Sequence, residues 1–294
     1  MSSEQEQTGR CGFVSETLES TREFLRGYLK NLLTRLTETE LDLSKALNLA
    51  ILSTKIARAE VIGAENLAQL EAPFICALNH SSLYLLGIQI PPIDVLVVMS
   101  NVEEIIGKEI VFIGKTNIPS SPFPEELTDS LMQALYSRIP KIIPVNTEKR
   151  FLSAARVALQ KLKAGVILLI CPEGASQRKY NRESEYHDGA AWLALRASLE
   201  LKEEVPIIPI AVRNAYSIKD VLLGRIEVVI GNPIYPQEVA NDIVKGIAIF
   251  MGIEVVKEIE LEKLRGYVAN SIVVGMTIRL QQAVNELYYG TAVK

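Results

Sequence analysis

The sequence predicts an α/β protein whose mixed, largely buried sheet is flanked by helices. Short β-branched runs alternate through the middle of the chain with segments of helical periodicity. These runs are continuously apolar, as in strands that are covered on both faces, rather than alternating as in strands with one face in water. The 294 residues, of which 48% are hydrophobic, suffice for a large core and exclude general disorder.

Three regions follow from this pattern. Residues 1–57 are expected to hold a polar tail and a helical hairpin, residues 58–236 the α/β domain, and residues 237–294 a helical C-terminal extension. The hairpin consists of an apolar-faced helix from Ser20 to Leu36 and a second helix from about Leu41 to Ile56. The first helix also has a basic face, so it fits either a membrane interface or packing on the core.

Six apolar runs are expected to form the strands of the α/β domain. They are FICAL (74–78), IVFI (110–113), KIIPV (141–145), VILLI (166–170), IIPIAV (207–212) and IEVVI (226–230). Between the runs, a stripe from Leu152 to Leu162 predicts a helix with Gly165 at its C-terminal cap. Gly189 is expected to open another helix that contains Trp192.

Composition excludes several classes of protein and site. The net charge of −4 argues against a nucleic-acid partner. The three cysteines cannot form a disulfide framework, and their odd number fits a reducing compartment. The two histidines exclude a site with three histidine ligands, and no zinc or calcium ligand spacing occurs, so no metal is expected.

The sequence also argues against a conventional membrane span. The polar N-terminus is followed by no apolar signal region. The richest apolar stretch, Leu83 to Met99, is interrupted by Pro91, Pro92 and Asp94 and falls short of the roughly 20 uncharged residues that a span needs. The protein is therefore expected to be intracellular.

A first cluster of chemically active residues, Asn79 to Ser82, follows the FICAL strand. Polar residues at the end of a buried strand lie where α/β folds place reactive groups. His80 has an ordinary pKa near working pH, which suits a general base. The alternative is a histidine in a turn whose ring satisfies a neighbour.

A second cluster, Cys171 to Arg178, follows the VILLI strand. Pro172 ends the strand, and Gly174 allows a tight turn. Arg178 offers a planar fork of donors for a phosphate or carboxylate. The alternative is an ordinary turn with a solvated arginine.

Four ordered blocks resemble those of the glycerolipid acyltransferase family, the 1-acylglycerol-3-phosphate and glycerol-3-phosphate acyltransferases. The blocks are NHSS (79–82), IVFIGK (110–115), CPEG (171–174) and VPIIPIAV (205–212). Each block is weak alone, but their order and spacing are specific, and the resemblance covers about residues 58 to 236.

The resemblance implies transfer of a fatty acyl group to the hydroxyl of a lysophospholipid or glycerol-phosphate-type acceptor. The donor would be acyl-CoA or acyl carrier protein, used as a co-substrate with no further cofactor. His80 would be the general base in a direct attack without a covalent intermediate. Lys115, Glu173, Gly174 and Arg178 would bind the acceptor and its phosphate. The protein would work in the cytoplasm, as a peripheral protein on the inner face of a membrane.

Two departures from the family pattern bear on this expectation. The family places an aspartate after four residues that follow the histidine, but Leu85 occupies that position. The next aspartate downstream is Asp94, and an insertion over 83–93 would return it to His80 in space. That insertion would either dip into lipid or begin a core-packed helix. Ala175 and Ser176 replace the family's threonine and arginine, which favours a different acceptor.

Other interpretations remain open or are excluded. Glu109 occupies the position at which a P-loop needs glycine, and no nucleophile elbow occurs. Cys171 could be a nucleophile paired with His80, but a small buried side chain is favoured. His187 could form a dyad with Asp188, but a capping or substrate-loop role is preferred. The rival functions are an acyltransferase for an acceptor without phosphate, and a non-catalytic module that binds a lipid or a partner.

Overall fold

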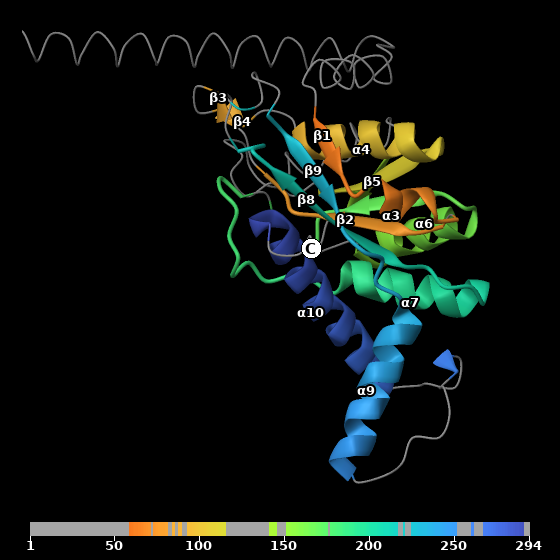
Figure 1. Ribbon diagram of the computed structural model, residues 1–294. Helices are drawn as coiled ribbons and strands as arrows, with labels where there is room; N and C mark the ends of the chain where they lie inside the picture. Colours follow the sequence, from red (N-terminus) through yellow and green to blue (C-terminus); the bar gives the residue numbers. More distant parts are fainter. Residues whose placement is uncertain are drawn as a thin grey trace, which may run out of the picture. The chain divides into compact units, whose positions relative to one another are not determined.

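A computed structural model describes most of the chain beyond residue 58 (Figure 1). The described residues are 59–71, 73–81, 84–85, 88–89, 93–115, 141–145, 151–175, 177–216, 220, 225–251, 260–261 and 267–290. The helical hairpin expected within residues 1–57 lies outside them.

One sheet of seven described strands forms the centre of this part of the chain. The strands are β1 (Glu60–Ile62), β2 (Ile75–Leu78), β5 (Ile110–Lys115), β6 (Ile142–Val145), β7 (Ile167–Ile170), β8 (Ile207–Arg213) and β9 (Glu227–Ile230). Their order is β1-β9-β8-β2-β7-β5-β6. Neighbouring strands pair in parallel except β8 and β9, which are antiparallel, so the prediction of a mixed sheet is confirmed.

Helices cover both faces of the sheet (Figure 1). The described helices are α3 (Glu65–Ala68), α4 (Ile93–Ile106), α6 (Phe151–Lys163), α7 (Gly189–Leu201), α9 (Pro236–Met251) and α10 (Tyr267–Tyr289). Side chains of α3 and α4 pack against one face, and those of α6, α7, α9 and α10 against the other. Because both faces are covered, β2 and β7 are buried along their whole length, as their unbroken apolar runs predict.

Each of the six predicted strands forms, and the helix boundaries follow the predicted caps. Gly165 has a φ of +78° just beyond α6, a conformation that favours glycine at a helix end. Helix α7 begins at Gly189. Strand β1 is missing from the prediction because its three residues are partly exposed and give no continuous apolar run.

The segment between His80 and Asp94 is expected from the sequence either to dip into lipid or to begin a core-packed helix, and the structure differs from the second expectation. It forms an antiparallel pair of short strands, β3 (Tyr84–Leu85) and β4 (Ile88–Gln89), and α4 begins only at Ile93. The alternative of a core-packed helix start is therefore wrong, because the chain reverses direction before the helix begins.

The C-terminal region is helical, as predicted, and its last helix is tied to the sheet. Helix α10 packs against β8 and α9. The guanidinium group of Arg213 donates a hydrogen bond from Nε to the carbonyl oxygen of Leu287 at 3.0 Å and pairs with Glu227 at 2.9 Å. A cation at a helix C-terminus is stabilising because it satisfies unpaired carbonyls. Among the helices that the structure describes, none is long and apolar enough to cross a membrane.

Candidate active site

The two predicted clusters lie at one edge of the sheet. Strands β2, β5, β7 and β8 run parallel to one another, so their carboxyl ends meet there. This edge therefore receives the residues after β2, the end of β5 and the loop after β7. It is the position at which open α/β sheets bind their ligands.

His80 and Asp94 form the central contact of the site. The Nδ1 atom of His80 lies 2.8 Å from Oδ2 of Asp94, and the backbone N–H of Ser81 donates to the same oxygen at 2.7 Å. Asp94 is fully buried in the first turn of α4, where the helix dipole favours a negative charge. The β3–β4 hairpin thus returns the aspartate to the histidine despite the longer spacing.

The contact defines which nitrogen of His80 is available for chemistry. Since Nδ1–H donates a hydrogen bond to the Asp94 carboxylate, Nε2 is left to accept a proton from a substrate. Burial lowers the pKa of His80, but the neighbouring Cys171 and Asp94 raise it by more, so it lies well above its ordinary value. The imidazole is therefore a stronger base than free histidine, and less of it is unprotonated at neutral pH.

The backbone around His80 is held from both sides. The amide of Asn79 continues the sheet, because its Oδ1 accepts from the N–H of Val212 at 2.7 Å and its Nδ2 donates to the same residue's carbonyl at 3.1 Å. The carbonyl of His80 accepts from the N–H of Gln177 at 2.9 Å. These bonds fix the position of the ring before any substrate binds.

The loop after β7 brings Lys115 and His187 together at Gly174. Gly174 has a φ of +65°, and a Cβ there would lie 2.5 Å from the His187 ring, so only glycine fits. The Nζ of Lys115 donates to the carbonyl of Gly174 at 3.3 Å. The structure thus brings Lys115 to the predicted loop. Arg178, in contrast, lies exposed further along it.

Glu173 is buried in this loop without a hydrogen-bond partner. Its side chain is 6% exposed, and neither carboxylate oxygen has a partner among the described residues. Burial raises its pKa to about 7, although the nearby His80 acts in the opposite direction. The carboxyl group therefore changes its charge near neutral pH.

Cys171 lies against the His80 ring, and each group shifts the pKa of the other. Burial is the largest effect on the thiol and raises its pKa, so the thiol is uncharged at neutral pH. By exposed surface the side chain is only partly buried, and its interpretation as a small packing residue stays a prediction. Within the described ranges, no group of three or more metal-ligating side chains is arranged to hold an ion.

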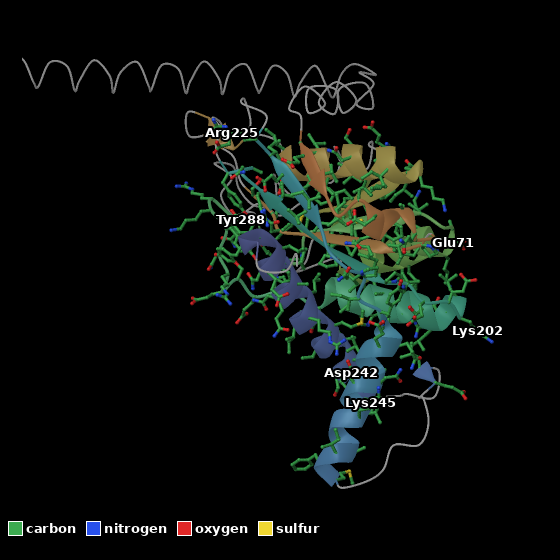
Figure 2. The ribbon with its side chains drawn as sticks, in the orientation of Figure 1. Glu71, Lys202, Arg225, Asp242, Lys245 and Tyr288 are labelled. Atoms are coloured by element: carbon green, nitrogen blue, oxygen red, sulfur yellow. The ribbon has the colours of Figure 1, made fainter. Side chains whose placement is uncertain are left out.

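One part of the site, a set of tyrosines from distant segments, is not predicted by any motif in the sequence. Tyr180 and Tyr186 lie in the loop between β7 and α7, and Tyr216 follows β8. Tyr288 lies at the end of α10, where Figure 2 labels it. The charge of Glu173 is among the causes that raise the pKa of the first three, after burial. These four tyrosines are spread over more than a hundred residues, so no local motif in the sequence contains them all.

A family model agrees with the block pattern, and the chain belongs to that family. The model of the acyltransferase family matches residues 58–213. A search of curated proteins finds no significant match. Among solved structures, the chain is similar to the 1-acyl-sn-glycerophosphate (LPA) acyltransferase PlsC from Thermotoga maritima, with 18% identity and a TM-score of 0.40. That match covers 78% of this chain and 91% of the other.

Proposed function

Because the chain belongs to the glycerolipid acyltransferase family, we propose that it moves a fatty acyl group from a thioester donor to a lipid hydroxyl, with His80 as general base. The donor is acyl-CoA or acyl carrier protein, and the acceptor is a lysophospholipid or a glycerol-phosphate-type lipid. The contact between His80 and Asp94 carries this proposal. It supplies an oriented base at the edge of the sheet where the family blocks meet.

The reaction needs one proton transfer and one acyl transfer. Nε2 of His80 takes the proton of the acceptor hydroxyl as its oxygen attacks the thioester carbonyl. The donor leaves as a thiolate and recovers that proton from the imidazolium. Asp94 holds the ring in the required tautomer and stabilises its positive charge. General-base catalysis of this kind contributes roughly 10²–10⁴-fold.

The acceptor is held on the other side of the base by the loop after β7. Lys115 and Arg178 are the cations that we assign to an acceptor phosphate, while Glu173 and Gly174 shape the space next to the reacting hydroxyl. We also expect the protein to work at a membrane surface on the cytoplasmic side, since its acceptor resides there.

The decisive test is acceptor-dependent release of free thiol from an acyl thioester. The wild-type protein should release coenzyme A or carrier thiol only when a lipid acceptor is present, and His80→Ala should reduce kcat by roughly 10²–10⁴-fold. Asp242→Asn, an exposed change on α9, is the control and should retain full turnover. Equal turnover by His80→Ala and wild type would sink the proposal. A wild-type protein that binds lipid without releasing thiol would favour the non-catalytic module.

A second acceptor class is favoured by two observations. Arg178 is exposed, and the buried carboxyl group next to His80 opposes a phosphate there. An acceptor without phosphate therefore remains a candidate. A panel of hydroxylated lipids with one acyl thioester separates the two, because strict dependence on a phosphate would exclude the second class.

A further inference from the structure

Five tyrosines lie close together, and three of them (Tyr180, Tyr186 and Tyr216) are near enough to Glu173 for its charge to raise their pKa. We refer to the five as the tyrosine cluster, and to the surface that they form as its wall. Its members are Tyr180, Tyr186, Tyr216, Tyr288 and Tyr289. The rings of Tyr180 and Tyr288 stack with centroids 3.8 Å apart, and Tyr216 meets the edge of Tyr288 at 6.4 Å. Helix α10 supplies part of this wall, although it lies beyond the residues matched by the family model.

Two hydroxyl groups of the tyrosine cluster are bonded within the protein. Tyr180 donates to Oδ1 of Asn285 at 2.5 Å, and Tyr216 accepts from Nδ2 of Asn79 at 3.0 Å. Because Tyr216 accepts in this bond, its own proton is still available to donate. These bonds make the wall a preformed surface rather than a set of loose side chains.

Two polar groups of the site are buried and make no hydrogen bond of normal geometry to any described residue. They are the hydroxyl of Tyr186 and both carboxyl oxygens of Glu173, although the Tyr180 hydroxyl lies near the first and the backbone N–H of His80 near the second. An unsatisfied buried polar atom costs about 1–3 kcal/mol, so folded proteins rarely retain three of them side by side. A ligand that both donates and accepts hydrogen bonds would satisfy all of them.

The charges around the wall select the kind of ligand. A phosphate would meet the carboxyl groups of Glu173 and Asp94, which repel it. An ammonium group would meet the protonated His80 ring. Neutral hydroxyl groups avoid both penalties, because each can donate to the carboxyl group and accept from a phenol.

We propose that Glu173 and Tyr186 form a subsite that binds free hydroxyl groups of a polyol head on the lipid acceptor, with the tyrosine cluster as its wall. This subsite rests on the acyl transfer proposed above and names the acceptor more closely. The polyol head lies next to the hydroxyl that His80 deprotonates, so its bonds orient the acceptor for attack.

The test compares three monoacyl phospholipids that share one acyl chain and differ in their head groups. They are lysophosphatidylglycerol, lysophosphatidylethanolamine and lysophosphatidic acid. Wild-type kcat/KM should be highest for the glycerol head. Tyr186→Phe should lose roughly tenfold on that head, the size of one hydrogen bond, and change little on the other two. Tyr235→Phe, at the start of α9 and away from the site, is the matched control and should change none of them.

Binding measurements separate this subsite from the reaction itself. Calorimetry on His80→Ala should show tighter binding of the glycerol head than of the ethanolamine head, and Tyr186→Phe should remove that difference. If the wild type transfers no acyl group but retains this preference, the subsite stands and the proposed reaction fails. If turnover depends on His80 but Tyr186→Phe has the same kcat/KM as the wild type for all three lipids, the subsite is refuted.

A stability measurement excludes a purely structural role for Tyr186. Because its hydroxyl is buried and makes no hydrogen bond of normal geometry to a described residue, Tyr186→Phe should leave the free energy of unfolding unchanged or raise it. A loss of stability together with a uniform loss of turnover would contradict the proposal.

Discussion

Two carboxyl groups, Asp94 and Glu173, lie within the same site but differ in their surroundings. Asp94 is fully buried and accepts hydrogen bonds from the His80 ring and the Ser81 N–H. Glu173 is almost as buried, yet neither of its oxygens has a hydrogen-bond partner of normal geometry in the part of the chain that the structure describes. One oxygen of Asp94 is bonded to the protein before substrate arrives, while its Oδ1 and both oxygens of Glu173 lack a partner among the described residues.

This difference indicates separate roles for Asp94 and Glu173 in the proposed reaction. A buried carboxylate is stabilised by hydrogen-bond donors that face it, and Asp94 accepts from the His80 ring and the Ser81 N–H. A buried carboxyl group without such partners holds its proton more tightly, and the pKa of Glu173 is raised to about 7. We therefore assign Asp94 to positioning the base and Glu173 to receiving the acceptor.

Removing the charge of Asp94 should have the largest effect. We expect Asp94→Asn to lower kcat/KM by roughly 10²–10⁴-fold, because the His80 ring loses its orientation and the stabilisation of its charge. The wild-type kcat/KM should rise with pH as His80 loses its proton. In Asp94→Asn this rise should move to lower pH, since a cause of the raised pKa is gone. A pH–rate profile that drops in height without moving would contradict the positioning role.

Removing the charge of Glu173 should increase the stability of the folded protein above neutral pH. The folded state binds this proton more tightly than the unfolded chain, so stability falls as pH rises from about 4.5 to about 7. Glu173→Gln removes that loss and should raise the free energy of unfolding by up to about 3 kcal/mol at pH 8, with little change at pH 4.

Denaturant titrations at the two pH values measure this gain. Glu185→Gln, an exposed change in the same loop, is the control and should leave stability within about 0.5 kcal/mol. A Glu173→Gln protein that is less stable than wild type at pH 8 would show that the carboxylate has partners after all.

Weakening the attachment of α10 to the sheet should impair binding of the acceptor and leave the function of His80 unchanged. Arg213→Gln removes the bonds to Leu287 and Glu227 and should cost about 1–3 kcal/mol of stability. The KM for the acceptor should rise several-fold, while the pH at which kcat/KM rises should not move. Arg196→Gln, which breaks an exposed pair on α7, is the matched control with an expected cost below about 0.5 kcal/mol. A shifted pH profile in Arg213→Gln would mean that the two sides are coupled.

Replacing the thiol next to His80 should have the smallest effect. Cys171→Ser keeps the size of the side chain, and the raised thiol pKa makes a thiolate nucleophile unfavourable, so kcat should change by less than about threefold. Mass spectrometry of the protein mixed with an acyl thioester should show no acyl adduct. An adduct on Cys171, lost in the serine variant, would replace direct attack by a covalent mechanism.

Much of the fold is predictable because its signals are local. The VILLI run is covered on both faces in β7, and the position of His80 directly after β2 follows from the order of apolar run and polar cluster. Asp94 is harder to predict, because the spacing to His80 departs from the family pattern and only the structure shows the 2.8 Å contact.

The acceptor side is not predictable from the sequence for a physical reason. Whether Glu173 finds a partner depends on side chains brought together by packing, and neither periodicity nor turn chemistry reports that. Tyr288 reaches the site only because α10 packs on β8 and Arg213 binds its end. Contacts between Tyr180 and Tyr288 span over a hundred residues, so no short motif contains both.

The hairpin between His80 and Asp94 has a consequence for how such proteins are recognised. Both of its ends are anchored, one at the close of β2 and the other in the first turn of α4, so the loop between them can change in length without moving either side chain. A sequence pattern with a fixed interval between histidine and aspartate would therefore pass over chains with the same geometry. A pattern that requires a strand before the histidine and a helix start at the aspartate, with a free interval between them, would find them.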